Sequence, residues 1–358
     1  MSFDNLSDKG VAEEPELGDR LFSCPVTKDA TFLCFDNTAV PIHKSVAAQS
    51  SSVLKHIFCA GDEVPVSPET CRPNSTVRLK ANKEAASFVV RYLYFGLPND
   101  ADKWQHSTIA AQTGNSIEKM KKWVHHIREI ATVAKRFNLR PILNFLIFNI
   151  HKAIFYEKEL VGSLLSELVS PIIEPEDAIE EFVILASYSF WFIKSTTQED
   201  VVFSYGTDVE ALFSCEDVQN LDERLFHKRP DIDHRTTPTV LLLGSNDRDM
   251  NGVYKSVKHP PCGSWNYQYS KENEDNMEYV FSEQWSGFPG HSGNNGCLFQ
   301  LQHNKRAKRK AGSNSNAPFY IYYSVTGEWT KESCLPRWDA LDGNVTPPVP
   351  FRFHMNND

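Results

Sequence analysis

The amino-acid sequence predicts an α+β protein with an N-terminal α/β domain, a helical extension and a C-terminal antiparallel β-rich domain. Near the N-terminus, short strand-like runs are followed by helical patterns, and apolar residues at helical spacing continue to about residue 233. After Pro238, glycine, asparagine, tryptophan and tyrosine become frequent among short alternating runs. The predicted parts are a flexible acidic leader (1–27), the α/β domain (28–155), an acidic helical region (156–236) and a β-rich aromatic module (237–358).

The first predicted elements are a β-hairpin, a helix and a third strand. Strand-prone residues fill Asp29–Asp36 and Thr38–His43, and the intervening Asp-Asn pair is typical of a tight turn. Ser45–Cys59 has helical spacing, with several apolar side chains available for burial. Prolines then interrupt the chain before a short alternating strand at Val77–Leu79.

Three further helices are predicted before residue 156. Asn82 is a suitable N-cap for a helix over Glu84–Phe95, and Gly96 is suited to end it. After a polar loop at 99–116, apolar residues recur at steps of three and four along one helical face: Trp123, Ile127, Ile130, Ala131, Ala134 and Phe137. Pro141 suits the first turn of the next helix, where its missing N–H costs little.

The remainder divides by composition. From Glu157 to about Asp233 the pattern stays helical, and acidic residues outnumber basic ones about three to one between residues 156 and 236. A linker is predicted at Arg229–Pro238. Beyond it, Thr239–Leu243 and five further strand-like runs are spaced as in a small antiparallel sandwich or barrel. Most aromatic residues of this module are expected in its core, and a few at loop ends could contact a ligand.

Composition narrows the function. The net charge of −9 argues against a broad nucleic-acid surface, because phosphate binding needs clustered Lys and Arg. The eight cysteines are scattered singly, and the N-terminus does not have the pattern of a signal peptide. No apolar run approaches the ~20 residues that span a bilayer. We therefore expect a cytoplasmic or nuclear protein that binds no membrane.

No enzymatic motif is complete. The serine-hydrolase pattern fails in G-H-S-G-N at 290–294, and the surrounding glycine-rich run lacks the Lys-Ser/Thr ending of a P-loop. His125 and His126 are adjacent on a helix, so they diverge, and we expect solvated or packed side chains rather than a metal site. Glu180 and Glu181 diverge in the same way and are expected on a hydrated face. The sequence thus predicts a protein that is not an enzyme and needs no cofactor or metal.

One basic cluster stands out in the C-terminal module. Its flanking Gln, Asn, Gly and Ser residues indicate an exposed loop between strands. A nuclear import signal and a plain solvated loop both remain open for this cluster, which comprises Lys305, Arg306, Lys308, Arg309 and Lys310.

Four motifs occur in an order that resembles a known domain. They are H-K at 43–44, with Ser51 and Leu54 following, the strand S-T-V-R-L-K, the helix ending Y-F-G at 94–96, and V-A-K-R-F-N-L at 133–139. In this order, over roughly Asp29 to Phe155, the chain resembles the BTB/POZ domain. The resemblance implies a domain that forms homodimers, and the acidic helical region is similar to the BACK-like helices that often follow it.

The resemblance also implies site residues. Asp29 and Lys44 occupy the positions of a charged pocket in the family. Many relatives dock a cullin scaffold through the helix after H-K and the following loop, which here points to Phe58, Glu63 and Val64. That loop lacks the usual apolar-x-Glu signal, because Gly61 stands two places before the glutamate.

Two functions follow from this resemblance. The first is a non-catalytic BTB adaptor that presents a client protein through its C-terminal module, with a substrate receptor of a cullin-type ubiquitin ligase as its more specific form. The alternative is a BTB scaffold or transcription-associated protein that binds no cullin.

Overall fold

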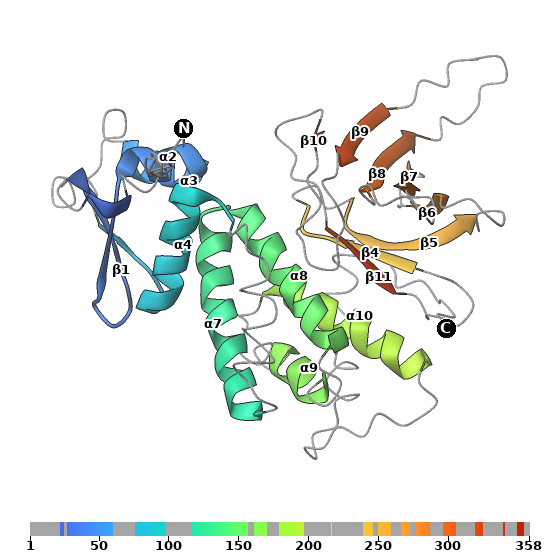
Figure 1. Ribbon diagram of the computed structural model, residues 1–358, viewed down its shortest axis with the longest axis horizontal. Coiled ribbons are helices and arrows are strands. Elements are labelled where there is room, and N and C mark those ends of the chain that lie inside the picture. The colour runs from blue at the N-terminus through green and yellow to red at the C-terminus, as the bar shows by residue number, and fades with distance from the viewer. Residues whose placement is uncertain are drawn as a thin grey trace, which may run out of the picture. The chain divides into compact units, whose positions relative to one another are not determined.

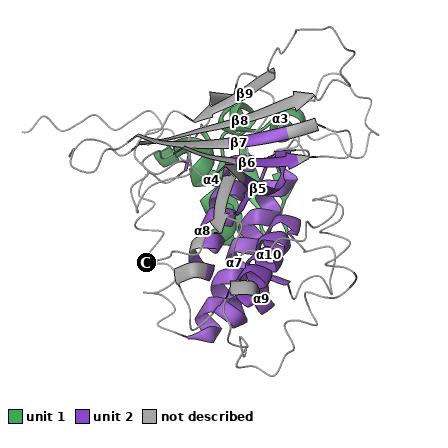
Figure 2. Cartoon of the chain, turned by 90° about the vertical axis from the view of Figure 1, so that its right-hand side faces the viewer, with its two compact units in different colours: residues 1–96 green, residues 97–358 purple. Residues whose placement is uncertain are grey.

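The computed structural model describes residues 22–24, 27–59, 76–97, 116–156, 161–169, 179–196, 216, 239–245, 250–258, 266–272, 277–286, 296–305, 319–324, 339–340 and 349–353. The chain divides into two compact units, Met1–Gly96 and Leu97–Asp358 (Figure 2). The described residues combine helices with β-sheets, which confirms the mixed α+β class.

The first unit contains a three-stranded sheet of order β2-β1-β3 (Figure 1). β1 (Ala30–Leu33) pairs antiparallel with β2 (Ala39–Ile42) and parallel with β3 (Thr76–Arg78). The predicted hairpin is confirmed. Its turn is closed by a hydrogen bond from Cys34 N to Thr38 O at 2.9 Å.

The predicted helix over Ser45–Cys59 is wrong in one respect, because the structure contains two helices there. α2 (Lys44–Ser50) and α3 (Ser52–Cys59) are separated by Ser51, whose backbone is extended. Ser51 Oγ accepts a hydrogen bond from Leu54 N at 3.1 Å and so caps the second helix. A buried serine that serves as an N-cap ends one helix and starts the next within a single residue.

α4 (Lys83–Phe95) follows β3 and packs against β2. The predicted cap is confirmed, since Asn82 Oδ1 accepts a hydrogen bond from Ala85 N at 2.8 Å. Gly96 ends the helix with a φ of 74°, a conformation that glycine adopts without strain. The buried side of the helix faces the sheet and includes Ala85, Ala86, Val89, Val90 and Leu93.

Four helices begin the described part of the second unit. They are α7 (Ile117–Arg136), α8 (Arg140–Tyr156), α9 (Val161–Val169) and α10 (Glu180–Thr196). All six residues of the apolar face predicted in the first of these segments are buried, which confirms that prediction. No helix in the described ranges is long and apolar enough to cross a membrane.

The C-terminal strands form one eight-stranded sheet in which every pairing is antiparallel. The strand order is β10-β9-β8-β7-β6-β5-β4-β11. The strands are β4 (Thr239–Leu243), β5 (Gly252–Lys258), β6 (Asn266–Glu272), β7 (Met277–Ser286), β8 (Gly296–Lys305), β9 (Phe319–Ser324), β10 (Asp339–Ala340) and β11 (Val349–Phe353).

The expected sandwich or barrel is therefore replaced by a single sheet. Helices pack against it: α8 contacts β11, and Tyr188 of α10 shares a 2.7 Å hydrogen bond with Thr239 of β4. Both of these polar residues are buried. The helices and the sheet belong to the same compact unit, Leu97–Asp358.

Gly244, directly after β4, marks a close approach between this sheet and α8. Its φ is 91°, and a Cβ built on it would lie 2.0 Å from the side-chain Oδ1 of Asn144. Asn144 itself is buried. Contact at this point requires a residue without a side chain.

We predict that Gly244→Ala destabilises the second unit by about 2 kcal/mol or more, because it adds steric overlap to backbone strain. Urea unfolding followed by tryptophan fluorescence would measure the loss. The matched control is the same substitution in an Asn144→Ala background, where the clash is removed and the cost should fall to that of the backbone. An equal cost in both backgrounds would contradict this account of the contact.

Candidate functional site

His43 is the centre of a polar cluster in the first unit. It lies between β2 and α2 and is buried. Its backbone N–H donates to the hydroxyl of Tyr94 on α4 at 3.0 Å, and its Nδ1 contacts the same hydroxyl. Its Nε2 lies 2.6 Å from the hydroxyl oxygen of Thr27. One histidine thus joins three segments that are far apart in the sequence.

The backbone contact has a fixed direction. The backbone N–H of His43 can only donate, so the Tyr94 oxygen accepts there. The phenol oxygen can also accept from a protonated Nδ1 or donate its own proton to a bare Nδ1, so these contacts are compatible with either tautomer of the ring. Burial raises the pKa of Tyr94, and the charge of Asp29 raises it further, while the hydrogen bond from His43 N opposes them. The phenol therefore keeps its proton at neutral pH.

The Thr27 contact has a structural consequence. It attaches the segment before β1 to His43, which is bound at the same time to Tyr94 of α4. The cluster is built to hold the segments together.

Asp29 and Lys44, the predicted charged pair, lie beside this cluster. Asp29 Oδ1 accepts a hydrogen bond from the backbone N of Lys44 at 2.8 Å. Lys44 is the first residue of α2, so the exposed carboxylate stabilises the positive end of that helix. This hydrogen bond thus uses the backbone of Lys44.

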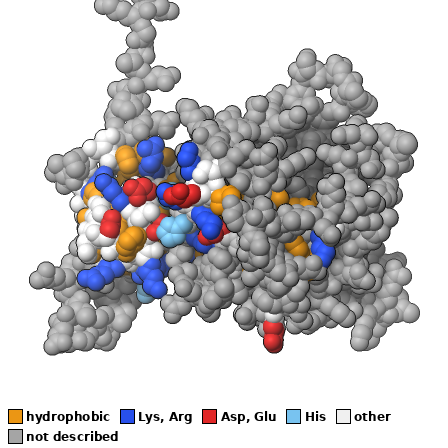
Figure 3. Space-filling view, turned by 90° about the horizontal axis from the view of Figure 1, so that it is seen from below, with side chains coloured by type: hydrophobic (Ala, Val, Ile, Leu, Met, Phe, Trp, Pro, Cys, Tyr) orange, Lys and Arg blue, Asp and Glu red, His pale blue; other side chains and the backbone are white. Residues whose placement is uncertain are grey.

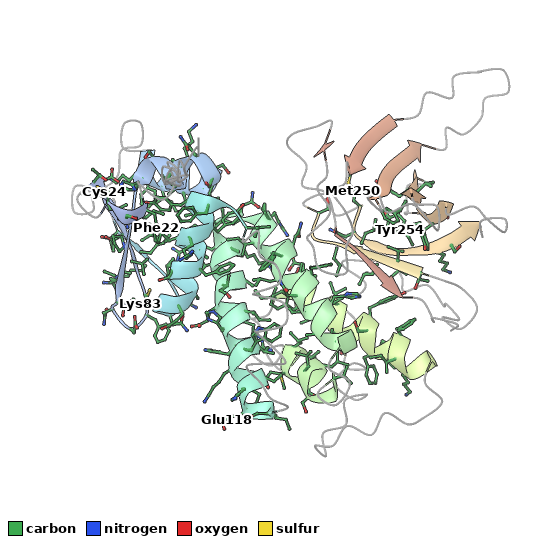
Figure 4. The ribbon with its side chains drawn as sticks, viewed as in Figure 1. Phe22, Cys24, Lys83, Glu118, Met250 and Tyr254 are labelled. Carbon is green, nitrogen blue, oxygen red and sulfur yellow. The ribbon has the colours of Figure 1, made fainter. Side chains whose placement is uncertain are left out.

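An aromatic cluster lies at the C-terminal end of α4. Phe22 packs edge-on against Tyr94 and Phe95, each at 5.3 Å between ring centroids. Lys28 Nζ lies 5.0 Å from the centre of the Phe22 ring, and the Arg91 guanidinium lies 5.9 Å from it. Figure 4 labels Phe22 at this end of α4 and Lys83 at the other. The last part of the predicted flexible leader is therefore packed on the domain.

Sequence reasoning missed Phe22 and Thr27 as parts of the site, because the leader shows no periodicity. The only signal for Tyr94 was its place in the Y-F-G motif.

The predicted docking residues are only partly described. Phe58 lies on α3 and is half-buried, while Glu63 and Val64 fall outside the described residues. Of the basic cluster, Lys305 ends β8, and Arg306, Lys308, Arg309 and Lys310 lie outside the described residues.

Ion pairs join the helices of the second unit. Arg128 of α7 and Glu167 of α9 approach to 3.7 Å, and burial lowers the pKa of Arg128 while Glu167 opposes that effect. Arg140 Nη1 donates a hydrogen bond to Glu181 Oε1 of α10 at 3.0 Å. Its side chain is only 14% exposed, so the expectation of a hydrated face is wrong for this glutamate. It lies instead where α8 meets α10.

Metal ligation finds no support among the described side chains, where no three His, Cys, Asp or Glu residues gather. His125 is exposed and lies 3.9 Å from Glu129, one helical turn away. The neighbouring His126 is half-buried.

Comparisons with known proteins leave the family undecided. No protein-family model matches this chain. No curated protein matches it in sequence.

We predict that Tyr94→Phe destabilises the first unit by about 1–3 kcal/mol, because both His43 N–H and Nδ1 lose their partner in a buried place. Hydrogen exchange of the α2 and α4 amides would report the loss. The matched control is Tyr92→Phe, two residues earlier, whose hydroxyl has no hydrogen-bond partner among the described residues. Equal losses from the two substitutions would contradict the central role of Tyr94.

Proposed function

We propose that this chain is a non-catalytic adaptor of the BTB/POZ class that mediates protein–protein interaction. The observation that carries the proposal is the order of elements around His43: a hairpin, a split helix, a third strand parallel to the first, and a helix ending in Y-F-G. This order supports the BTB resemblance of the sequence motifs. The helices α9 and α10 stand where the resemblance expects BACK-like helices.

The chemistry of the described residues favours binding over catalysis. Both ring nitrogens of His43 contact hydroxyl groups of the first unit, Nε2 that of Thr27 and Nδ1 that of Tyr94, which fits a structural role. Several charged side chains of the second unit form ion pairs between helices, as in the contact of Arg140 with Glu181. The proposal therefore assigns the protein no reaction of its own.

In this proposal the first unit carries the self-association. The BTB class forms homodimers. A dimer of this chain would carry two C-terminal modules, one from each copy. A client that binds both modules would be held more tightly, because binding to the first module raises the effective concentration of the second.

The dimer is tested on the purified full-length chain. We predict a mass of about twice 40.7 kDa by light scattering coupled to size-exclusion chromatography. A mass of one chain at all concentrations would contradict the dimer and with it the adaptor mechanism. Tyr94→Phe serves as a control for folding. If this variant loses the dimer because it unfolds, its circular dichroism spectrum changes as well.

A substrate receptor for a cullin-type ubiquitin ligase is the more specific form of the proposal. Phe58 on α3 is half-buried, so part of its ring is available to anchor a helical partner. Glu63 and Val64 follow this helix in the sequence and complete the proposed docking segment. The missing apolar-x-Glu signal and the basic cluster at 305–310 favour the alternative, a scaffold or transcription-associated protein without a cullin.

Affinity purification followed by mass spectrometry distinguishes the two. We predict that a cullin is recovered with the wild type and lost with Phe58→Ala and Glu63→Lys, because these changes remove the anchor and reverse a rim charge. Ile57→Ala, an equally half-buried change on the same helix, should keep the cullin. Recovery of no cullin with the wild type would leave the scaffold as the function.

A further inference from the structure

The tip of the β1–β2 hairpin displays the most exposed large hydrophobic side chain among the described residues. Phe35 is 65% exposed, whereas Phe95, the next, is 38% exposed. A scattered exposed apolar residue is ordinary on a protein surface, so exposure alone assigns nothing. The surroundings of this ring carry the argument.

The backbone holds Phe35 in place. Phe35 N donates to Ala81 O at 3.2 Å, so the tip is fastened to the segment between β3 and α4. Within the turn, Asn37 N donates to Cys34 O at 3.0 Å, and Asn37 takes a φ of 62°. Thr38 N donates to the Asp36 carboxylate at 2.9 Å, and these hydrogen bonds hold the pKa of Asp36 below its usual value. The tip is thus a rigid support for its aromatic side chain.

Cations gather around the same tip. Leu33 pairs with Arg78 in the sheet, and Leu79 N donates to Leu33 O at 2.8 Å, which brings the end of β3 beside the turn. Lys80 precedes Ala81, and Lys83 begins α4 and lowers the pKa of Asp36 through its charge. All three cations, Arg78, Lys80 and Lys83, are exposed.

Figure 4 shows Lys83 at the same lower end of the unit as the turn between β1 and β2. In the view from below, the described part of the surface carries Lys and Arg, Asp and Glu, and hydrophobic side chains together (Figure 3). Two carboxylates also lie at this end, those of Asp36 and the exposed Glu84. The Asp36 carboxylate is already engaged within the turn.

We propose that this hairpin tip, composed of Phe35, Arg78, Lys80 and Lys83, is a docking surface for an acidic protein segment with an aromatic or aliphatic anchor. Charge complementarity selects the occupant: three exposed cations favour carboxylates, and the long aliphatic stems of lysine and arginine add apolar area around the ring. The rigid turn needs no further ordering on binding, which reduces the entropic cost of association.

This surface lies outside α3 and the segment after it, which the proposed cullin contact uses. It goes beyond the proposed function, and its experiment can fail while the adaptor proposal stands. If both hold, one copy of the first unit could engage an acidic partner while the C-terminal module engages another.

The test uses the full-length chain and a short fluorescein-labelled peptide of glutamates around a central Trp-Leu pair, measured by fluorescence anisotropy. We expect Lys80→Glu with Lys83→Glu to weaken binding about tenfold. We expect Phe35→Ser to weaken it about fivefold, because the apolar contact is lost. Circular dichroism of each variant confirms folding, since all three residues are exposed.

The matched control reverses two exposed lysines elsewhere. Lys119→Glu with Lys122→Glu makes the same change of charge on α7, in the other unit, and should leave peptide affinity unchanged. Equal weakening by this control would overturn the proposal in favour of general electrostatic attraction. It would also be overturned if a peptide with Ser-Ser in place of Trp-Leu bound equally well, or if the wild type bound phosphatidylserine vesicles but not the peptide.

Discussion

The hydrogen bonds between His43 and Tyr94 are the constraint on which the first unit depends. They connect the end of β2 and the start of α2 with the last turn of α4, and His43 and Tyr94 are 51 positions apart. Burial makes these bonds obligatory, because an unpaired imidazole or amide there would cost the full desolvation penalty. Thr27 on the other ring nitrogen extends the same network to the segment before β1. The sheet, the split helix and α4 are thereby held in one arrangement.

Ring packing and hydrogen bonding reinforce each other in this network. Phe22 packs edge-on against the Tyr94 ring, and partial burial raises the pKa of that phenol. Partial exclusion of water in turn strengthens the hydrogen bonds of His43. A surface built on this foundation, such as the hairpin tip with Phe35, is carried by a rigid core.

Local signals made much of the first unit predictable. The Asp-Asn turn, the Asn82 cap and the six-residue apolar face of α7 each depend on neighbours in the sequence, and each is found in the structure. The break at Ser51 was not predicted, because the residues around it keep helical spacing and only the Oγ contact ends the helix. Glu181 and Phe22 were misjudged for a related reason: their partners, Arg140 and Tyr94, lie far away in the chain. Likewise, strand patterns predicted antiparallel pairing but could not reveal that α8 contacts β11 and that α10 bonds to β4.

The pairing of β11 with β4 has a consequence for how the chain is made. β4 receives β5 on one side soon after it is synthesised, but its other neighbour emerges about 100 residues later. Until β11 is synthesised, one edge of β4 has unpaired backbone amides and carbonyls, which can pair with a strand of another chain. The residues of β4 are Thr, Val and Leu, all of which are buried in the folded protein. A ribosome-bound or truncated chain that lacks residues 349–353 should consequently need a chaperone, or it should aggregate through that edge.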